Sequence, residues 1–340
     1  MKASILSKVI DDFRLGREIL ATEAEPFLDA LILESDASVI SSVLTAWHEK
    51  GIEENEIYEI ARIMRDRMTR VNSKHQTLVD IVGTGGSRAK TFNVSTAASF
   101  VVAGAAVPVA KHGNKAATSN SGSADVLSVL GVNPAVDAET AERCLNEIGI
   151  CFMFAPNFHK LSPMLGKVRR GLGFPTIFNC VGPLCNPASA SNQLIGVWDR
   201  ALVPKIANAL GRLGTNKSWV VHGENGQDEI ALNGTTLVAE VGSDVREFEI
   251  SSEYFGFEPS TGDGPRINDP IESAALIREI LSSGIVSHSL TDIALLNAAA
   301  ALCLTDESAS PADAAERVSE SLHSGRANMK LRALAEATPA

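Results

Sequence analysis

The sequence predicts an α/β protein with two parts: a small all-helical N-terminal domain and a larger α/β domain with a mainly parallel central sheet and surrounding helices. Residues 1–70 place apolar side chains at helical spacing and show no strand-like alternation. From Gln76 onwards, β-like apolar runs alternate with helical segments, the order expected of a parallel sheet. The length of 340 residues also suits two domains. We expect them at 1–72 and 76–340, with a helical segment near 160–190 completing the first.

The N-terminal part predicts several helices, because its apolar residues recur three or four positions apart. The three clearest stretches are Ile5, Val9 and Phe13; Val39, Val43, Leu44 and Trp47; and Ile57, Ile60, Ala61 and Met64. Gly51 and Asn55 separate the last two stretches, as the end of one helix and the beginning of the next would.

The α/β part begins with TLVDIVGTGG, a β-like run that ends in glycines. A helix-like stretch and a second β-like run follow, up to Asn114. Further β-like runs are expected at 150–154, 193–197 and 218–222, and helices at 139–147, 160–171 and 201–213. From 227 to 250 the pattern predicts shorter alternating strands, with a hairpin-type turn signal at Asn233-Gly234. Residues 257–269 predict a loop, and 270–338 an Ala-rich helical region.

The composition excludes several classes of function. Lys and Arg number 30 against 41 Asp and Glu, a net charge of −11, so the chain lacks the basic field that nucleic acids or anionic membranes require. The five cysteines are odd in number and show no Cys-x-x-Cys spacing, which favours a reducing cytoplasm over a disulfide framework or zinc site. Asp11 and Asp12 interrupt any signal peptide, and the longest apolar run, 97–110, is too short to span a membrane.

The segment 80–96, DIVGTGGSRAKTFNVST, is the first candidate site. Three glycines follow a β-like run, and small hydroxyl residues begin a helix. Glycines let the backbone approach a ligand, and a helix N-terminus offers free N–H groups, so this segment predicts a cradle for phosphate or pyrophosphate. Its spacing matches neither a dinucleotide fingerprint nor a P-loop. Taken alone, a tight turn with an ordinary helix cap explains the glycines as well.

A second candidate lies at 109–125, where Lys111, His112 and Asn114 leave the end of a buried β-like run and Ser119 and Ser123 follow. Ligands of parallel sheets gather beyond the carboxyl ends of strands, and packing alone does not explain this polar sequence. A solvated polar loop is the alternative.

Three further candidates are weaker when taken singly. The tandem Arg169 and Arg170 are able to clamp a carboxylate, or to lie on a solvated helix face. The adjacent Asp228 and Glu229 suit Mg²⁺, or a solvated turn. A single His159 is more often structural than catalytic.

The order and combination of these segments are more specific than any one of them. Gly-Thr-Gly-Gly with Thr-Phe-Asn-x-Ser-Thr, then Lys-His-Gly-Asn, Ser-Gly-Ser-Ala-Asp-Val-Leu, Thr-Ile-Phe-Asn, Gly-Pro-Leu-x-Asn-Pro and Asp-Glu resemble the anthranilate phosphoribosyltransferase family. The resemblance runs from EPFLDALILESD to LLNAAAAL, nearly the whole chain. The related pyrimidine nucleoside phosphorylases differ at the Lys-His-Gly-Asn and Thr-Phe-Asn segments.

The resemblance implies an active site in a cleft between the two domains and a homodimer formed through the helical domains. It implies anthranilate and 5-phosphoribosyl 1-diphosphate (PRPP) as substrates, and N-(5-phosphoribosyl)anthranilate and pyrophosphate as products. By motif match, the donor contacts are Gly83, Gly86, Asn93, Ser95, Thr96, Lys111 and Ser123, and Ser87, Thr91 and Ser119 are further implied substrate contacts. The implied acceptor path is lined by His112, Asn114, His159, Arg169 and Gly182. The implied Mg²⁺ ligands are Ser95, Asp228 and Glu229, and the implied catalytic residues are Lys111, Arg169, Asp228 and Glu229.

The sequence departs from the family pattern at three positions. Ser87 stands where Asp is usual, Lys115 where Arg is usual, and Asn120 where Lys is common. Ser87 removes a negative charge beside the expected pyrophosphate site, whereas Lys115 keeps its charge but loses the guanidinium fork. Neither Arg169 nor an expected metal ligand is changed. Two alternatives stay open: a transferase with another aromatic acceptor, and a non-catalytic nucleic-acid-binding paralogue, which the net charge of −11 opposes.

Overall fold

The computed structural model describes residues 4–87, 92–115, 121–260, 267, 269–283, 288–305 and 310–339. The strands are β1 (Val79–Gly83), β2 (Val109–Gly113), β3 (Ile150–Phe154), β4 (Asn192–Gly196), β5 (Lys217–Gly223), β6 (Thr236–Val241) and β7 (Val245–Ile250). The first helices are α1 (Ile5–Arg14), α2 (Ala21–Leu33), α3 (Ala37–Lys50), α4 (Glu54–Arg67), α5 (Val94–Gly104), α6 (Ser123–Val129), α7 (Ala138–Glu147) and α8 (Ala155–Phe158). They are followed by α9 (Pro163–Gly171), α10 (Ile177–Leu184), α11 (Leu202–Arg212), α12 (Pro270–Ser283), α13 (His288–Cys303), α14 (Pro311–His323) and α15 (Arg326–Ala337).

The strands form one sheet in the order β3-β2-β1-β4-β5-β6-β7. The first five strands are parallel, and β6 and β7 are antiparallel to their neighbours. The predicted α/β class with a mainly parallel sheet is therefore confirmed. Because the chain runs outward from β1 to β3 and then returns to β4 on the other side of β1, the strand order reverses there. Open α/β sheets bind ligands at such a reversal, beyond the carboxyl ends of the strands.

Both faces of the sheet are covered by helices, and alternate strand residues face them. On β1, Ile81 joins a core with α5 and α13, whereas Val82 joins a core with α4, α10 and α11. On β4, Leu194 and Ile195 divide in the same way. The two-sided burial explains why consecutive residues of each strand, Ile81 and Val82 on β1 and Leu194 and Ile195 on β4, are apolar.

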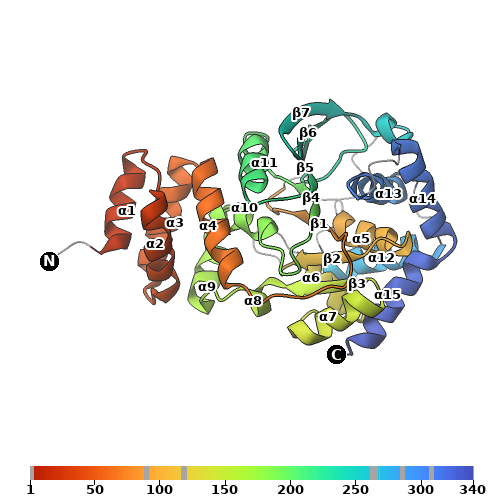
Figure 1. Ribbon diagram of the computed structural model, residues 1–340, viewed down its shortest axis with the longest axis horizontal. Coiled ribbons are helices and arrows are strands. Elements are labelled where there is room, and N and C mark those ends of the chain that lie inside the picture. Colours follow the sequence, from red (N-terminus) through yellow and green to blue (C-terminus); the bar gives the residue numbers. More distant parts are fainter. Residues whose placement is uncertain are drawn as a thin grey trace.

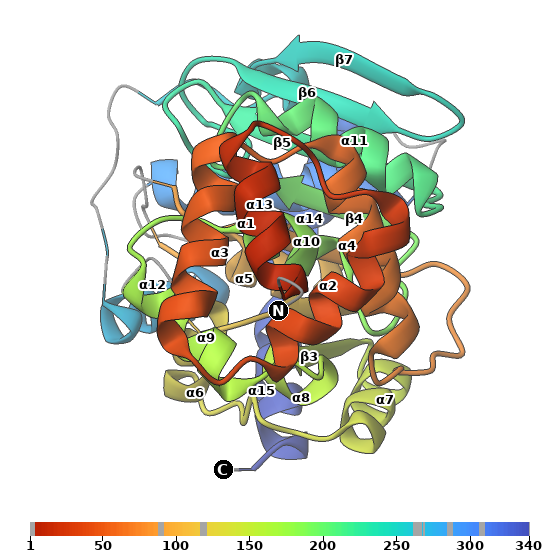
Figure 2. The ribbon, with the colours of Figure 1, turned by 90° about the vertical axis from the view of Figure 1, so that its left-hand side faces the viewer.

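The four N-terminal helices lie together at one end of the molecule, far from the blue C-terminal helices (Figure 1). Seen from that end, they stand in front of the sheet (Figure 2). Trp47 stacks on Phe13 with ring centroids 5.1 Å apart and meets Phe27 edge-on at 5.6 Å. α3 contacts α9, and α4 contacts α10 and α11, so later helices continue the same core.

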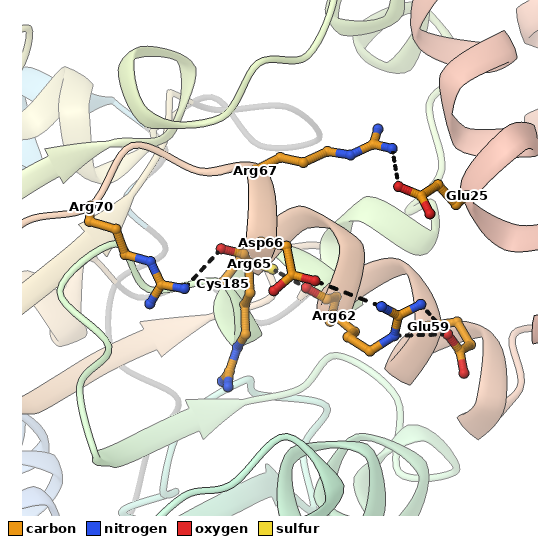
Figure 3. A network of polar contacts seen from close by, with 9 residues as sticks. Glu25, Glu59, Arg62, Arg65, Asp66, Arg67, Arg70 and Cys185 are labelled. Carbon is orange, nitrogen blue, oxygen red and sulfur yellow. Dashed lines mark hydrogen bonds and ion pairs between the residues drawn. The ribbon is translucent and has the colours of Figure 1, made fainter.

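Arginines at the end of α4 link this helix to α2, α10 and α11; Figure 3 shows the pair between Arg67 and Glu25. Arg67 pairs with Glu25 of α2 at 2.8 Å. Arg65 donates from Nε to the carbonyl of Leu184 at 2.6 Å and from Nη1 to that of Leu213 at 2.9 Å. These carbonyls end α10 and α11, where a cation is favourable to the helix dipole. The irregular segment 68–78 then leads to β1.

The structure confirms the turn expected at Asn233-Gly234 but corrects the strand expected before it. Gly234 does turn, with φ of +81°, but the residues before it form only an isolated bridge between Gly223 and Gln227. The β6–β7 hairpin turns instead at 242–244. Among the described residues, no helix is both long and apolar enough to cross a membrane.

Candidate active site

A cavity of about 560 Å³ lies at the carboxyl ends of the central strands. Its wall combines the glycine loop after β1, the end of β2, and helices α9 and α10. The loop that carries Asp228 and Glu229, called the carboxylate loop below, completes the wall. The cavity brings together most of the predicted site residues. Those that line it are Gly83, Asn93, Ser95, Lys111, His112, Asn114, Ser123, His159, Arg169, Gly182, Asp228 and Glu229.

Gly86 and Ser87 lie beside the cavity rather than in its wall. A Cβ at Gly86, where φ is +87°, would lie 2.9 Å from the ring of Pro175, so this glycine permits a close turn. The Ser87 hydroxyl donates to the carbonyl of Gly226 at 2.9 Å. The residue that departs from the family pattern thus ties the glycine loop to the carboxylate loop.

Thr96 is also absent from the cavity wall. It lies in the first turn of α5 with its side chain fully buried, and its hydroxyl has no hydrogen-bond partner within the described residues. Thr91 and Ser119, two further predicted contacts, lie outside the described residues.

The carboxylate loop packs directly against two glycines at strand ends. A Cβ at Gly83 would lie 2.7 Å from Asp228 Oδ2, and one at Gly196 would lie only 1.6 Å from the carbonyl oxygen of Asp228. The backbone N–H of Gly85 donates to Asp228 Oδ2 at 3.1 Å. Glycine is therefore required at these two strand ends for the carboxylate to reach the glycine loop.

Asn297 of α13 holds the next part of the same loop. Its side-chain oxygen accepts from the N–H of Ile230 at 3.0 Å, and its Nδ2 donates to the carbonyl of Ile230 at 3.1 Å. A third bond, to the carbonyl of Ile293 at 2.9 Å, orients the amide itself. One buried side chain thus fixes the backbone beside Glu229. Sequence reasoning missed Asn297, because its Ala-rich helix gives no sign of which loop packs against it.

Lys111 is fully buried at the end of β2. Its Nζ donates to the carbonyl of Ile81 at 2.7 Å and lies 3.4 Å from the Ser95 hydroxyl. Burial lowers the pKa of Lys111 to about 8, while the charges of Asp80 and Glu229 act in the opposite direction. The ammonium is held at the floor of the cavity by neutral oxygens in direct contact.

Asn93 is the centre of a polar cluster at the start of α5. Its side-chain oxygen accepts from the hydroxyls of Ser121 at 2.8 Å and Ser273 at 3.0 Å. Its N–H donates to the Ser273 hydroxyl at 3.1 Å. Ser273, on α12, has no signal in the local sequence that links it to this site.

The two predicted histidines meet in the wall of the cavity. Nε2 of His112 and Nε2 of His159 are 3.1 Å apart, so one ring donates to the other. Burial lowers the pKa of His159 to about 4, and burial followed by the neighbouring imidazole lowers that of His112 well below its usual value. The pair is therefore neutral at pH 7 and offers hydrogen bonds rather than charge.

Arg169 lies near the end of α9 and faces the same cavity. Its guanidinium carbon sits 5.0 Å from the centroid of the Phe178 ring. Burial, and then the charge of Arg170, lower the pKa of Arg169 to about 10, so it remains a cation at pH 7. Its Nε is buried and has no hydrogen-bond partner among the described residues. A half-buried cation whose buried Nε faces no partner among these residues is suited to an anionic ligand.

The carboxylates fit a hard divalent cation that is shared with a ligand. Asp228 and Glu229 line the cavity with oxygen donors, the type that Mg²⁺ prefers. In the described part of the chain, no group of three or more His, Cys, Asp or Glu side chains is placed to hold a metal. Mg²⁺ commonly binds through one or two carboxylates together with substrate phosphates, and this pair suits that mode.

Comparisons with known proteins agree with this arrangement. Residues 75–328 match the model of the glycosyl transferase family, a/b domain. The chain is 42% identical over 341 residues to the anthranilate phosphoribosyltransferase of Pelotomaculum thermopropionicum, covering 99% of this chain and 97% of that one. The Thermus thermophilus enzyme of that name superposes with a TM-score of 0.87 at 34% identity, covering 97% and 99% of the two chains. The Saccharomyces cerevisiae enzyme in complex with PRPP and Mg also gives 0.87, at 28% identity, covering 99% and 98%. The chain therefore belongs to the anthranilate phosphoribosyltransferase family.

Proposed function

We propose that this protein transfers the 5-phosphoribosyl group of PRPP to the amine of anthranilate and releases pyrophosphate, a step of tryptophan biosynthesis. The observation that carries the proposal is the composition of one cavity. It joins a glycine loop and a carboxylate pair, which suit a metal-bound diphosphate, to a half-buried arginine, which suits a carboxylate.

The donor is assigned to the side of the cavity near β1 and β2. Backbone N–H groups of the glycine loop and the Lys111 ammonium would face the phosphates, since both are donors aimed at anions. The hydroxyl of Ser95 and the amide of Asn93 line the same region. The yeast relative solved with PRPP and Mg supports this class of donor.

Asp228 and Glu229, with Ser95, would hold Mg²⁺ against the pyrophosphate. When bound, the metal supplies positive charge that stabilises the departing diphosphate. The chain's own part is to keep the two carboxylates in place through Gly196, Gly85 and Asn297, so that no reorganisation is needed as the leaving group develops charge.

The acceptor is assigned to the side near α9 and α10. Arg169 would bind the anthranilate carboxylate, and the neutral His112–His159 pair, with Asn114 and Gly182, would line its path. An aromatic amine is already neutral at pH 7, so the transfer needs little help from a general base. Catalysis would then come mainly from positioning and electrostatics.

Two broader expectations remain proposals. We place residues 1–72 and the helical segment near 160–190 in one domain, supported by the contact of α3 with α9 and of α4 with α10. We also propose a homodimer through these helices. Leu15, Leu20 and Leu33, which are 66%, 62% and 83% exposed, provide apolar surface there. Sedimentation velocity on the wild type and on Leu33→Ser tests it: a monomeric wild type would reject the dimer.

A cytoplasmic location is supported by the five buried free cysteines, a state that a reducing compartment preserves.

The decisive experiment is loss of anthranilate fluorescence when the purified protein meets PRPP and Mg²⁺. We expect metal-dependent loss, and the double variant Asp228→Asn/Glu229→Gln should abolish it while retaining the wild-type melting curve. If the folded protein binds PRPP without consuming anthranilate, the acceptor is wrong. If it binds neither substrate, the transferase proposal is wrong.

A further inference from the structure

The strand pair β1–β2 opens towards the active site, and a buried carboxylate lies in the opening. β1 pairs with β4 along its whole length. Its pairing with β2 consists of one residue pair, Val79 with Val109. Beyond that point the two strands separate just where β2 presents Lys111 and His112. Asp80, fully buried on β1, faces this gap.

Side chains replace the missing ladder bonds between these strands. Asp80 Oδ1 accepts from the backbone N–H of His112 at 3.1 Å. Lys111 Nζ donates to the carbonyl of Ile81 at 2.7 Å. Asn186 Nδ2 donates to the carbonyl of Ala110 at 2.8 Å and to Asp80 Oδ2 at 2.8 Å.

Asn186 is itself held in one orientation. Its side-chain oxygen accepts from the N–H of Ala188 at 2.9 Å, and the residue is 3% exposed. Because the amide nitrogen faces two acceptors and its oxygen faces a donor, a flipped amide would break every one of these bonds. Asn186 thereby fixes the carboxylate of Asp80 from the side opposite to His112.

Burial and charge make this arrangement sensitive to substitution. Burial raises the pKa of Asp80 to about 6, against the opposing effects of the Lys111 charge and the Asn186 hydrogen bond. A carboxylate is a poor choice for a buried site unless its charge and acceptors are used. Here both oxygens accept, and the charge acts on the buried ammonium of the next strand.

We propose that Asp80 is a positioning residue of the active site, which with Asn186 fixes the end of β2 and thereby aims both Lys111 and His112 into the cavity. Asp80 is absent from the cavity wall and therefore acts through its neighbours. The proposal rests on the proposed function for the identity of the two substrates. Since Lys111 serves the donor side and His112 the acceptor side, the KM values of both substrates should respond to Asp80.

The test is the steady-state kinetics of Asp80→Asn, corrected for the folded fraction. Aspartate accepts one hydrogen bond at each oxygen, from the His112 N–H and from Asn186 Nδ2. The amide of Asp80→Asn has a single oxygen, so its NH₂ group must face one of these two donors. We expect kcat to fall about 10- to 100-fold, the range that misplacement by about 1 Å produces, and both KM values to rise. Asn186→Ala should change the same parameters, and the double variant should cost less than the product of the single effects.

A swapped pair provides the rescue. In Asp80→Asn/Asn186→Asp, the amide introduced at position 80 would accept from His112 and donate to the carboxylate introduced at position 186, which would also accept from Ala188. Three of the four bonds made by the original pair would return, all but the one to Ala110. Because an oxygen of the carboxylate at position 186 would face the carbonyl of Ala110, the rescue should be partial. We expect kcat to rise by about threefold or more over Asp80→Asn, which general loss of stability would not produce.

The matched control is Asn192→Ala. Asn192 is also fully buried, begins β4, donates to the carbonyl of Leu304 and is absent from the cavity wall. It should lower the melting temperature while leaving kcat and both KM values within about twofold of wild type. Wild-type kinetics in folded Asp80→Asn, or an equal kinetic loss in the control, would overturn the proposal. If Asp80→Asn does not fold, the kcat and KM values of Asn186→Ala, compared with those of the control, test the proposal in its place. An inactive wild type would instead reject the proposed function.

Discussion

Gly196 offers the sharpest test of how the carboxylate loop is placed. It ends β4, and a Cβ there would lie 1.6 Å from the carbonyl oxygen of Asp228 and 2.3 Å from its carbonyl carbon. Favourable contact between such atoms begins at about 3.5 Å, so Gly196→Ala must push this backbone away by about 2 Å. The strand is fixed by neighbours on both sides, and the loop is the part that can yield.

The displacement carries Asp228 away from the N–H of Gly85, which it meets at 3.1 Å. Misplacement of a reacting group by about 1 Å can cost about 10²-fold in rate, so we expect kcat to fall by at least that factor. The Mg²⁺ concentration that gives half-maximal rate should rise as well. The stability cost of overpacking should be about 1–3 kcal/mol, small enough for the protein to remain folded.

The assay is anthranilate fluorescence at saturating PRPP across a Mg²⁺ titration, with thermal denaturation of the same samples. Gly171→Ala is the matched control, because a Cβ at that exposed position of α9 meets nothing within 4 Å. It should keep wild-type activity. If folded Gly196→Ala retains more than about half of the wild-type kcat, the loop does not depend on this close approach and the reasoning fails.

Three further predictions follow from the same geometry. Asn297→Leu removes the side-chain partners of the Ile230 N–H and carbonyl, and should lower kcat about tenfold in a folded enzyme. Unchanged kinetics would show that Asn297 does not hold the loop in its active position. Arg169→Leu should raise the anthranilate KM about 10- to 100-fold but not that of PRPP, and an unchanged anthranilate KM would remove Arg169 from the acceptor site. Burial lowers the pKa of His159 from 6.5 to about 4, so the folded state binds fewer protons than the unfolded chain. The free energy of unfolding should therefore fall by about 3 kcal/mol between pH 7 and pH 4 relative to His159→Gln, and parallel pH curves for the two proteins would contradict this.

The parallel strands were predictable because helices cover both faces of the sheet and bury their side chains. The run at 150–154 is apolar throughout and matches β3 as observed. The run expected at 193–197 differs from β4 by one residue at each end. Such runs need no knowledge of the rest of the fold, since any parallel strand covered by helices has this composition.

The turn at Asn233-Gly234 shows where local signals fail. The dipeptide does form a turn, as its conformational preference requires. Whether strands flank it depends on remote contacts, and the residues before it are held by Asn297, 67 positions away in the sequence. A pairing of this kind cannot be inferred from the local pattern.

The site was predictable where its residues stand in conspicuous motifs and unpredictable where they act through contacts with distant parts of the chain. Lys111, Asp228 and Arg169 stand out as polar groups in conspicuous motifs, and the cavity brings them together. Asp80 offered one signal, a carboxylate within an apolar run, whose meaning depends on the opening between β1 and β2. Thr96 shows the opposite kind of error. It belongs to the Thr-Phe-Asn-x-Ser-Thr motif and was predicted as a donor contact, but it does not line the cavity.

The balance of charge in the cavity explains why these supporting residues matter. The half-buried Arg169 has a buried Nε with no hydrogen-bond partner in the described part of the chain. The Lys111 ammonium contacts neutral oxygens, although Asp80 and Glu229 lie close enough to act on it. Two desolvated cations held in this way gain most from anions that arrive with the substrates, and they do so without moving. A carboxylate in direct contact with either cation would use up that interaction in the free enzyme. By holding Asp80 on backbone and amide donors, the fold keeps its negative charge near Lys111 but leaves the ammonium available to the substrate.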